Sequence, residues 1–166
     1  SSRKGNIVPL MKLVESMREH VKINYLARYK DEWSHEDIQR IANQVSLGAI
    51  KYGMLKMDTN KKIVFDLNEW LKLDGDTGPY IQYAHARIRS VLRKYSEVKT
   101  ENENGELAWD SVQSLNPLEV QLLVNLSQFN STVLAAVENY RPHLLCNYLF
   151  DLAKAFSSFY AECEIG

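Results

Sequence analysis

The chain has 166 residues, of which 45% are apolar and 25% are charged, and its formal net charge is −1. This length and composition correspond to about one globular domain with a core of its own, and the near-neutral charge excludes a protein that holds nucleic acid by bulk electrostatic attraction. No apolar run approaches the roughly 18 residues that cross a bilayer, and no secretory signal opens the chain, so we expect a cytoplasmic protein that does not contact a membrane.

The first half of the chain is predicted to form two amphipathic helices. The first six residues are polar, and Pro9 opens a helix to about Tyr29. Ser34, with Asp37 three residues later, predicts the N-cap of a second helix. Residues 61–65 contain apolar side chains but no partner strand, which favours coil or a single edge piece, and Asp66 is placed to cap a short helix ending near Trp70.

The stretch from Leu73 to Tyr95 joins a glycine-bearing loop to a strongly patterned helix, and Pro79 lies in the first helical turn, where proline is tolerated. On a wheel of about 100° per residue, the stripe predicted to be buried has His85 at its edge. Tyr80 lies at the margin of this stripe. The stripe consists of Ile81, Ile88, Leu92 and Tyr95, and the opposite edge carries Tyr83, Arg87 and Lys94.

The exposed edge of this helix combines an aromatic ring with two cations beside a flexible loop. Such a combination is typical of sites for single-stranded nucleic acid, because rings stack on bases and cations meet phosphates. The alternative is that Tyr80 and Tyr83 pack under a neighbouring helix while the cations are solvated. Any RNA contact must be local, because the net charge is close to zero.

The last third of the chain is predicted to be helical as well. An acidic connector precedes Asn116, Pro117 and Glu119, which predict an N-cap, an N1 proline and an N3 glutamate. A helix to about Phe129 follows, and a further helix ends near Tyr140. Pro142 then starts a last helix with a wide apolar face, formed by Leu145, Tyr148, Leu149, Leu152, Phe156 and Phe159. Helices joined by short breaks indicate an all-α bundle.

No catalytic or metal-binding constellation is visible. Asp74 and Asp76 resemble the paired carboxylates of magnesium sites, but they precede a helix, so a cap by Asp76 or Thr77 is the favoured interpretation. The four histidines are scattered without the spacing of metal ligands. Cys146 and Cys163 have no CxxC partner, which indicates two reduced cysteines and no metal site.

The glycine-bearing loop and the helix after it contain Gly75-Asp76-Thr77-Gly78-Pro79-Tyr80, followed by Gln82-Tyr83-Ala84-His85-Ala86-Arg87. This string resembles the signature of the class I arginyl-tRNA synthetase family at the entry to its helical anticodon-binding domain, and other segments resemble the family in the expected order. Gly48-Ala49-Ile50-Lys51-Tyr52 resembles the Gly-Ala-Val-Lys-Tyr run of the family. Similar segments are Ser2-Arg3-Lys4-Gly5-Asn6, at the end of the signature loop, and Tyr148-Leu149-Phe150-Asp151-Leu152-Ala153 with Phe159-Tyr160.

This resemblance implies an all-α helical bundle of the class I synthetase anticodon-binding type. Residues 1–72 would form the end of the signature loop and connecting helices, and residues 73–166 an anticodon-binding bundle that is C-terminally incomplete. Both ends look cut, so we expect a fragment of a larger enzyme. Helices that cover Phe156 and Phe159 in the family would then be missing, which predicts exposed apolar surface around these two rings and self-association.

The resemblance also implies a function, which is recognition of a tRNA anticodon within an enzyme that attaches arginine to its tRNA by using ATP with Mg. The tRNA-binding residues would be Tyr80, Tyr83, Arg87 and Tyr160, and Lys4 would belong to the ATP-site loop. The implied partners are arginine tRNA and the missing catalytic domain of the same chain, with no DNA. The fragment alone is expected to need no cofactor and to lack catalysis. The alternative function is a non-catalytic helical protein-interaction module that uses the face from Leu145 to Phe159.

Overall fold

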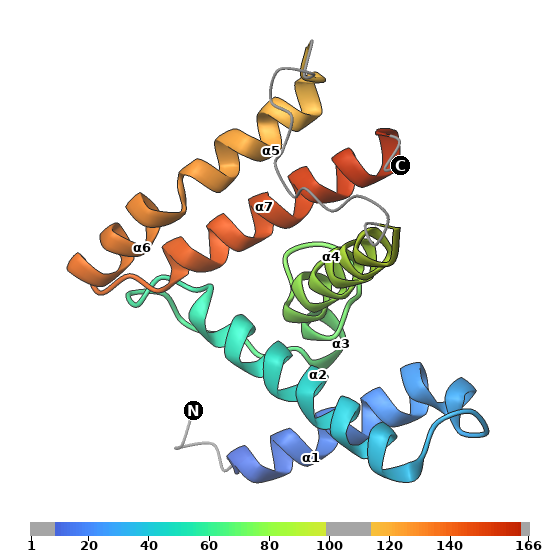
Figure 1. Cartoon of the computed structure of the whole chain (residues 1–166). Helices are drawn as coiled ribbons and strands as arrows, with labels where there is room; N and C mark the ends of the chain where they lie inside the picture. The colour runs from blue at the N-terminus through green and yellow to red at the C-terminus, as the bar shows by residue number, and fades with distance from the viewer. Residues whose placement is uncertain (1–8, 99–113, 164–166) are drawn as a thin grey trace. The chain divides into compact units, whose positions relative to one another are not determined.

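The computed structural model describes residues 9–98 and 114–163, which fall into two compact units, residues 1–80 and residues 81–166 (Figure 1). In the described ranges the regular structure is helical and contains no β-strand, which confirms the all-α prediction. Helix α4 (Gly78–Val98) begins in the first unit and continues in the second. The predicted division of the chain into residues 1–72 and 73–166 stays a prediction.

The first unit begins with a helix that changes its hydrogen-bonding pattern along its length. Helix α1 (Leu10–Val21) continues as a π-helical turn (Lys22–Leu26) and a 3₁₀ turn (Ala27–Tyr29), so the predicted helical segment to Tyr29 is confirmed. The π turn holds five residues where an α-helical turn holds fewer. As a result, Val21, just before the turn, and Leu26, its last residue, are both buried in the same core.

The next two helices begin at the caps that their sequences predict. Helix α2 (His35–Leu55) starts after Ser34, whose hydroxyl oxygen accepts a hydrogen bond from the Asp37 N–H at 3.0 Å. Helix α3 (Leu67–Trp70) starts after Asp66, whose carboxylate accepts from the Glu69 N–H at 3.0 Å. Each cap satisfies a backbone donor that the first helical turn leaves unpaired.

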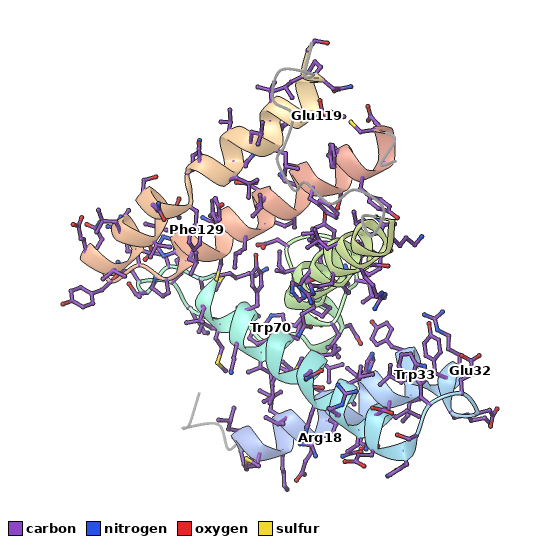
Figure 2. All side chains as sticks on the ribbon, in the orientation of Figure 1. Arg18, Glu32, Trp33, Trp70, Glu119 and Phe129 are labelled. Carbon is purple, nitrogen blue, oxygen red and sulfur yellow. The ribbon has the colours of Figure 1, made fainter. Side chains whose placement is uncertain are left out.

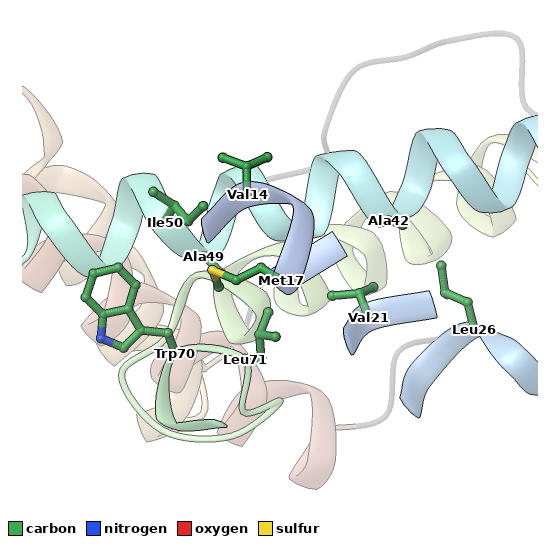
Figure 3. Packing of buried hydrophobic residues seen from close by; sticks show 9 residues of the cluster. All are labelled: Val14, Met17, Val21, Leu26, Ala42, Ala49, Ile50, Trp70 and Leu71. Carbon is green, nitrogen blue, oxygen red and sulfur yellow. The ribbon is translucent and has the colours of Figure 1, made fainter. Parts of the chain in front are cut away.

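Side chains from α1, the π turn, α2 and α3 converge on one hydrophobic core (Figure 3). Met17 and Leu71 are completely buried at its centre. The Tyr25 hydroxyl donates to the backbone carbonyl of Leu71 at 3.0 Å, which ties the π turn to the end of α3. The buried members are Val14, Met17, Val21, Leu26, Ala42, Ala49, Ile50, Trp70 and Leu71.

The indole of Trp70 lies directly on the backbone of α2. A Cβ atom built on Gly53 would come within 2.6 Å of the Trp70 ring, which is closer than real carbon contacts allow. The Phe65 ring meets the same indole edge-on, with centroids 4.9 Å apart and an interplanar angle of 81°. Glycine at position 53 is therefore a condition for the packing of α3 on α2.

The second unit contains residues 81–98 of α4 and three further helices: α5 (Pro117–Ser127), α6 (Phe129–Glu138) and α7 (His143–Glu162). The predicted capping box of α5 is complete. The Asn116 side chain accepts the backbone N–H of Leu118, and the Glu119 carboxylate accepts the backbone N–H of Asn116. Figure 1 shows α5 and α6 along one side of α7, and Figure 2 marks their first turns by Glu119 and Phe129.

Burial in the second unit differs from the prediction at two places. Phe156 is buried and Phe159 half-buried, so the expectation of uncovered surface around these rings is wrong. Leu92 was predicted to be buried, yet 51% of it is exposed, and Ala84 is the buried residue among positions 81–94 of this helix. The exposed apolar side chains lie instead on α5 and α6 and include Val120, Leu123, Val124, Leu126, Leu134 and Val137.

The stretch Pro117–Glu138 is long and apolar enough to cross a membrane by length and composition alone, contrary to the expectation from sequence. It consists of two helices that meet at Gln128, and both of them contact α7. A helix pair that packs on a third helix of its own bundle passes the same test of composition.

Replacement of Gly53 tests the close packing on Trp70. We expect Gly53→Ala to lower the free energy of unfolding by about 1 to 3 kcal/mol, because the added methyl group overpacks against a ring that cannot yield. Helix propensity alone predicts the opposite sign, since Ala is favoured over Gly by about 1 kcal/mol. Urea unfolding measures the change, and the exposed Lys51→Ala on the same helix serves as the control. A gain in stability for Gly53→Ala would contradict the packing.

The α2 N-cap predicts a dependence on pH. Hydrogen bonds from Arg40 and Ser34 lower the pKa of Asp37 from its ordinary 3.8. A lowered pKa in the folded state adds stability above the unfolded value, and this stability is lost as the pH falls through the folded pKa. Between pH 5 and pH 2 we therefore expect Asp37→Asn to lose less stability than the unchanged chain, as measured by chemical unfolding. Parallel curves would mean that Asp37 does not contribute.

Candidate nucleic-acid interface

The loop before α4 is held by hydrogen bonds from its own threonine. The Thr77 hydroxyl donates to the Lys72 carbonyl at 2.7 Å, and its oxygen accepts the Tyr80 N–H at 3.2 Å. Thr77 is therefore the helix-entry cap, one of the two candidates that the sequence offered. Gly75 has a φ of 75°, a conformation that residues with a side chain rarely adopt.

Asp76 binds the last two turns of α2. Its carboxylate accepts a hydrogen bond from the Tyr52 hydroxyl at 2.6 Å and forms an ion pair with Lys56, with 3.2 Å between nitrogen and oxygen. The Lys56 ammonium also donates to the Asp76 carbonyl at 2.6 Å. These contacts assign the Asp76 carboxylate to a structural role, and no group of metal ligands occurs among the described residues.

The start of α4 also approaches α2 through its backbone. A Cβ atom on Gly78 would lie 2.7 Å from the carbonyl oxygen of Gly48. Since backbone atoms cannot move aside as a flexible side chain can, glycine at position 78 allows the loop and the first turn of α4 to lie against α2. Beside this contact is an open hollow of mixed charge, lined among others by Lys56, Lys62, Glu69, Trp70, Lys72, Asp74 and Asp76.

In the second unit, three predicted site residues come together in an aromatic–cation cluster, formed by Tyr83, Arg87 and Tyr160. The Arg87 guanidinium carbon lies 4.9 Å from the centre of the Tyr83 ring and 4.7 Å from the centre of the Tyr160 ring. Tyr83 and Arg87 are one turn apart on α4, whereas Tyr160 is near the end of α7. Tyr83 and Tyr160 are 48% and 37% exposed, so ring surface remains open to solvent.

The cluster continues into the α7 core, because the Tyr160 ring lies 5.8 Å from the Phe156 ring at an angle of 39°. Tyr160 thus has an apolar contact on one side and the cation on another. Phe156 is buried, which fixes the inner end of the row. The arrangement presents two tyrosine rings and a guanidinium at a surface, and these are the groups that stack on unpaired bases.

The remaining predicted site residues have different positions. Tyr80 is half-buried, lies one helical turn before Tyr83, and donates its N–H to the Thr77 cap. His85 is exposed on α4. Lys4 lies outside the described residues. Sequence reasoning missed the role of Lys56, for which the signal was weak: Tyr52 and Lys56 are four residues apart on one helix face, but nothing in that spacing names Asp76 as their partner.

The two cysteines have different surroundings. Cys146 is buried in α7, and Cys163 is half-buried at its C-terminal end. Burial raises the pKa of the Cys163 thiol, and the nearby carboxylates of Glu119 and Glu162 raise it further. A raised pKa keeps the thiol protonated, which is the opposite of what a reactive nucleophile requires.

A family model described as "DALR anticodon binding domain" matches residues 81–166, which contain the whole aromatic–cation cluster. The chain belongs to this family. The match covers the second unit, residue for residue. The interpretation of that unit as an anticodon-binding helical bundle, first reached from sequence motifs, is therefore confirmed.

Similar proteins extend the likeness to the whole chain. The chain is 55% identical to the arginine–tRNA ligase of Bdellovibrio bacteriovorus over 166 residues, which is 100% of the chain and 28% of that protein. It is 37% identical to the enzyme of Thermobifida fusca over 164 residues, or 99% of the chain and 27% of that protein. The chain therefore spans a little over a quarter of the length of these relatives.

Solved structures show the same fold. The arginyl-tRNA synthetase of Thermus thermophilus superposes with a TM-score of 0.77 at 34% sequence identity, covering 96% of the chain and 25% of that structure. Arginyl-tRNA synthetase from Plasmodium falciparum gives a TM-score of 0.76 at 26% identity, covering 95% of the chain and 27% of that structure. The helical architecture is thus one that synthetases of this name contain.

The Asp76 contact predicts the effect of a single hydroxyl. We expect Tyr52→Phe to lower the free energy of unfolding by about 1 to 2 kcal/mol, because a hydrogen bond to a charged group is lost while the ring stays. Tyr29→Phe removes a hydroxyl of the same unit that has no partner among the described residues, and it serves as the matched control. Thermal and urea unfolding measure both variants. Equal stability of the two would argue against the role of Asp76.

Proposed function

We propose that the chain recognises the anticodon loop of an arginine tRNA. The observation that carries this proposal is the aromatic–cation cluster within the residues that match the anticodon-binding family. Bases in an anticodon loop are unpaired and can be stacked on aromatic rings, and an arginine that packs on those rings belongs to the same stacking surface. Tyr80, one turn earlier on α4, would add a further contact at the margin of the site.

In the longer protein, this recognition would serve the attachment of arginine to its tRNA. The relatives that carry the name arginine–tRNA ligase are several times longer than the chain, so the remaining sequence would supply the catalytic domain. ATP with Mg would be bound there, and Lys4 would lie at the edge of that ATP site. The chain's own contribution is to select the tRNA and to place it.

A local site agrees with the charge of the chain. With a net charge of −1, the protein cannot attract RNA over its whole surface, and affinity must come from stacking and a few cations. The alternative function, a protein-interaction module that uses the face from Leu145 to Phe159, loses its basis in the fold. Cys146, Tyr148 and Phe156 are buried on that helix, and Leu145, Leu149, Leu152 and Phe159 are half-buried.

Removal of the rings tests the proposal. We expect Tyr83→Ala and Tyr160→Ala each to weaken binding of an arginine tRNA transcript by about 1 to 3 kcal/mol, because each removes one stacking surface. Tyr140→Ala removes a tyrosine at the end of α6 that is 86% exposed and lies outside the cluster, so its affinity should be unchanged. Fluorescence anisotropy gives the affinity, and thermal melting is recorded in parallel.

Two outcomes would contradict the proposal. If affinity is unchanged while the melting temperature falls, the tyrosines only stabilise the bundle. If a transcript with an altered anticodon binds as tightly as the arginine transcript, the chain does not read the anticodon.

A further inference from the structure

The Arg87 guanidinium contacts two aromatic rings. An arginine that binds phosphate would instead present its charge to solvent. The guanidinium of Arg87 is shared by Tyr83 and Tyr160, and the side chain is half-buried. The ion pairs between described residues do not include Arg87, so no carboxylate in that part of the chain neutralises it. The planar guanidinium of Arg87 thus packs on the two rings.

The two tyrosines that Arg87 contacts belong to different helices. Tyr83 is on α4 and Tyr160 on α7, and Arg87 joins them because it lies one turn after Tyr83 on the same face. Guanidinium is planar and weakly hydrated, so it stacks on aromatic rings better than the ammonium of lysine does. A tyrosine side chain that rotates freely at a surface loses rotamer freedom when a base stacks on its ring, and this loss weakens the affinity.

We infer that Arg87 is a positioning residue of the anticodon site: it holds the Tyr83 and Tyr160 rings in place before RNA arrives, and it does not act as a phosphate contact. The part of this inference that concerns RNA binding rests on the proposed function. The part that concerns the position of the rings does not, because Arg87 contacts both rings in the free protein. Lys94, an exposed cation on the same edge of α4, is the residue placed to meet a phosphate.

The first experiment uses the RNA-free protein. Two aromatic rings near a guanidinium shift the resonance of its Nε–H proton upfield, so the Arg87 signal in a ¹H–¹⁵N spectrum should lie upfield of the other arginines. Tyr160→Leu should move it part of the way back. An Arg87 resonance at the position of a solvated arginine would overturn the inference, whatever the chain binds.

The second experiment separates positioning from charge. Arg87→Lys keeps the charge and loses the plane, and we expect it to bind an arginine tRNA transcript about 10-fold more weakly at every salt concentration. Each phosphate contact contributes about 0.7 to 0.9 to the slope of log affinity against log salt. The slope should therefore be unchanged in Arg87→Lys and in the neutral Arg87→Gln, whereas the control Lys94→Gln should lower it.

A double-mutant comparison completes the design. In a Tyr160→Leu background, Arg87→Lys should have little further effect, because residues that act through one another are not additive. Wild-type affinity for Arg87→Lys, or a lowered slope for Arg87→Gln, would overturn the positioning role while leaving the proposed function intact. If the unchanged chain fails to bind the transcript, or if Tyr83→Ala binds as well as the unchanged chain does, the proposed function fails and the inference about RNA fails with it.

Discussion

Backbone approaches to α2 that leave no room for a side chain determine the structure of the first unit. Trp70 lies on Gly53, and Gly78 lies on the carbonyl of Gly48, so α3 and the start of α4 both use the same helix as a support. The Asp76 contacts with Tyr52 and Lys56 then fix the loop between them. Packing at van der Waals distance permits few alternative arrangements of α2, α3 and the loop that ends at Gly78.

The helix that leaves the loop carries the proposed recognition groups. Tyr83 and Arg87 are on the second and third turns of α4, and they acquire their partner only where Tyr160 of α7 reaches them. A rigid helix positions side chains more accurately than a loop does, which suits a site that must distinguish bases. The glycine-bearing loop thus belongs to the packing of the first unit, whereas the aromatic–cation cluster belongs to the second unit and would, under the proposed function, offer its rings to RNA.

Sequence reasoning succeeded where the chemistry is local. The caps formed by Ser34, Asp66 and Asn116 depend on residues at most three positions away, and all three were predicted. It failed where a distant partner decides. Leu92 has the spacing of a buried residue yet is 51% exposed, and Asp76 finds partners 20 and 24 positions away, which no periodicity encodes. The exposed edge of Tyr83 was predictable, but its cation contact with Tyr160 required the fold.

The π-helical turn after α1 has a consequence for how this sequence tolerates changes in length. In an α-helix, five residues rotate about 140° beyond a full turn, so Val21 and Leu26 would point in different directions. The wider turn brings both into the core, and Tyr25 reaches Leu71 from the same segment. Loss of one residue here would leave an ordinary α-helical turn, in which four residues rotate only about 40° beyond a full turn, so the core residues on either side would keep their direction. This segment can therefore lose one residue with less effect on the core than a helix of regular α geometry can.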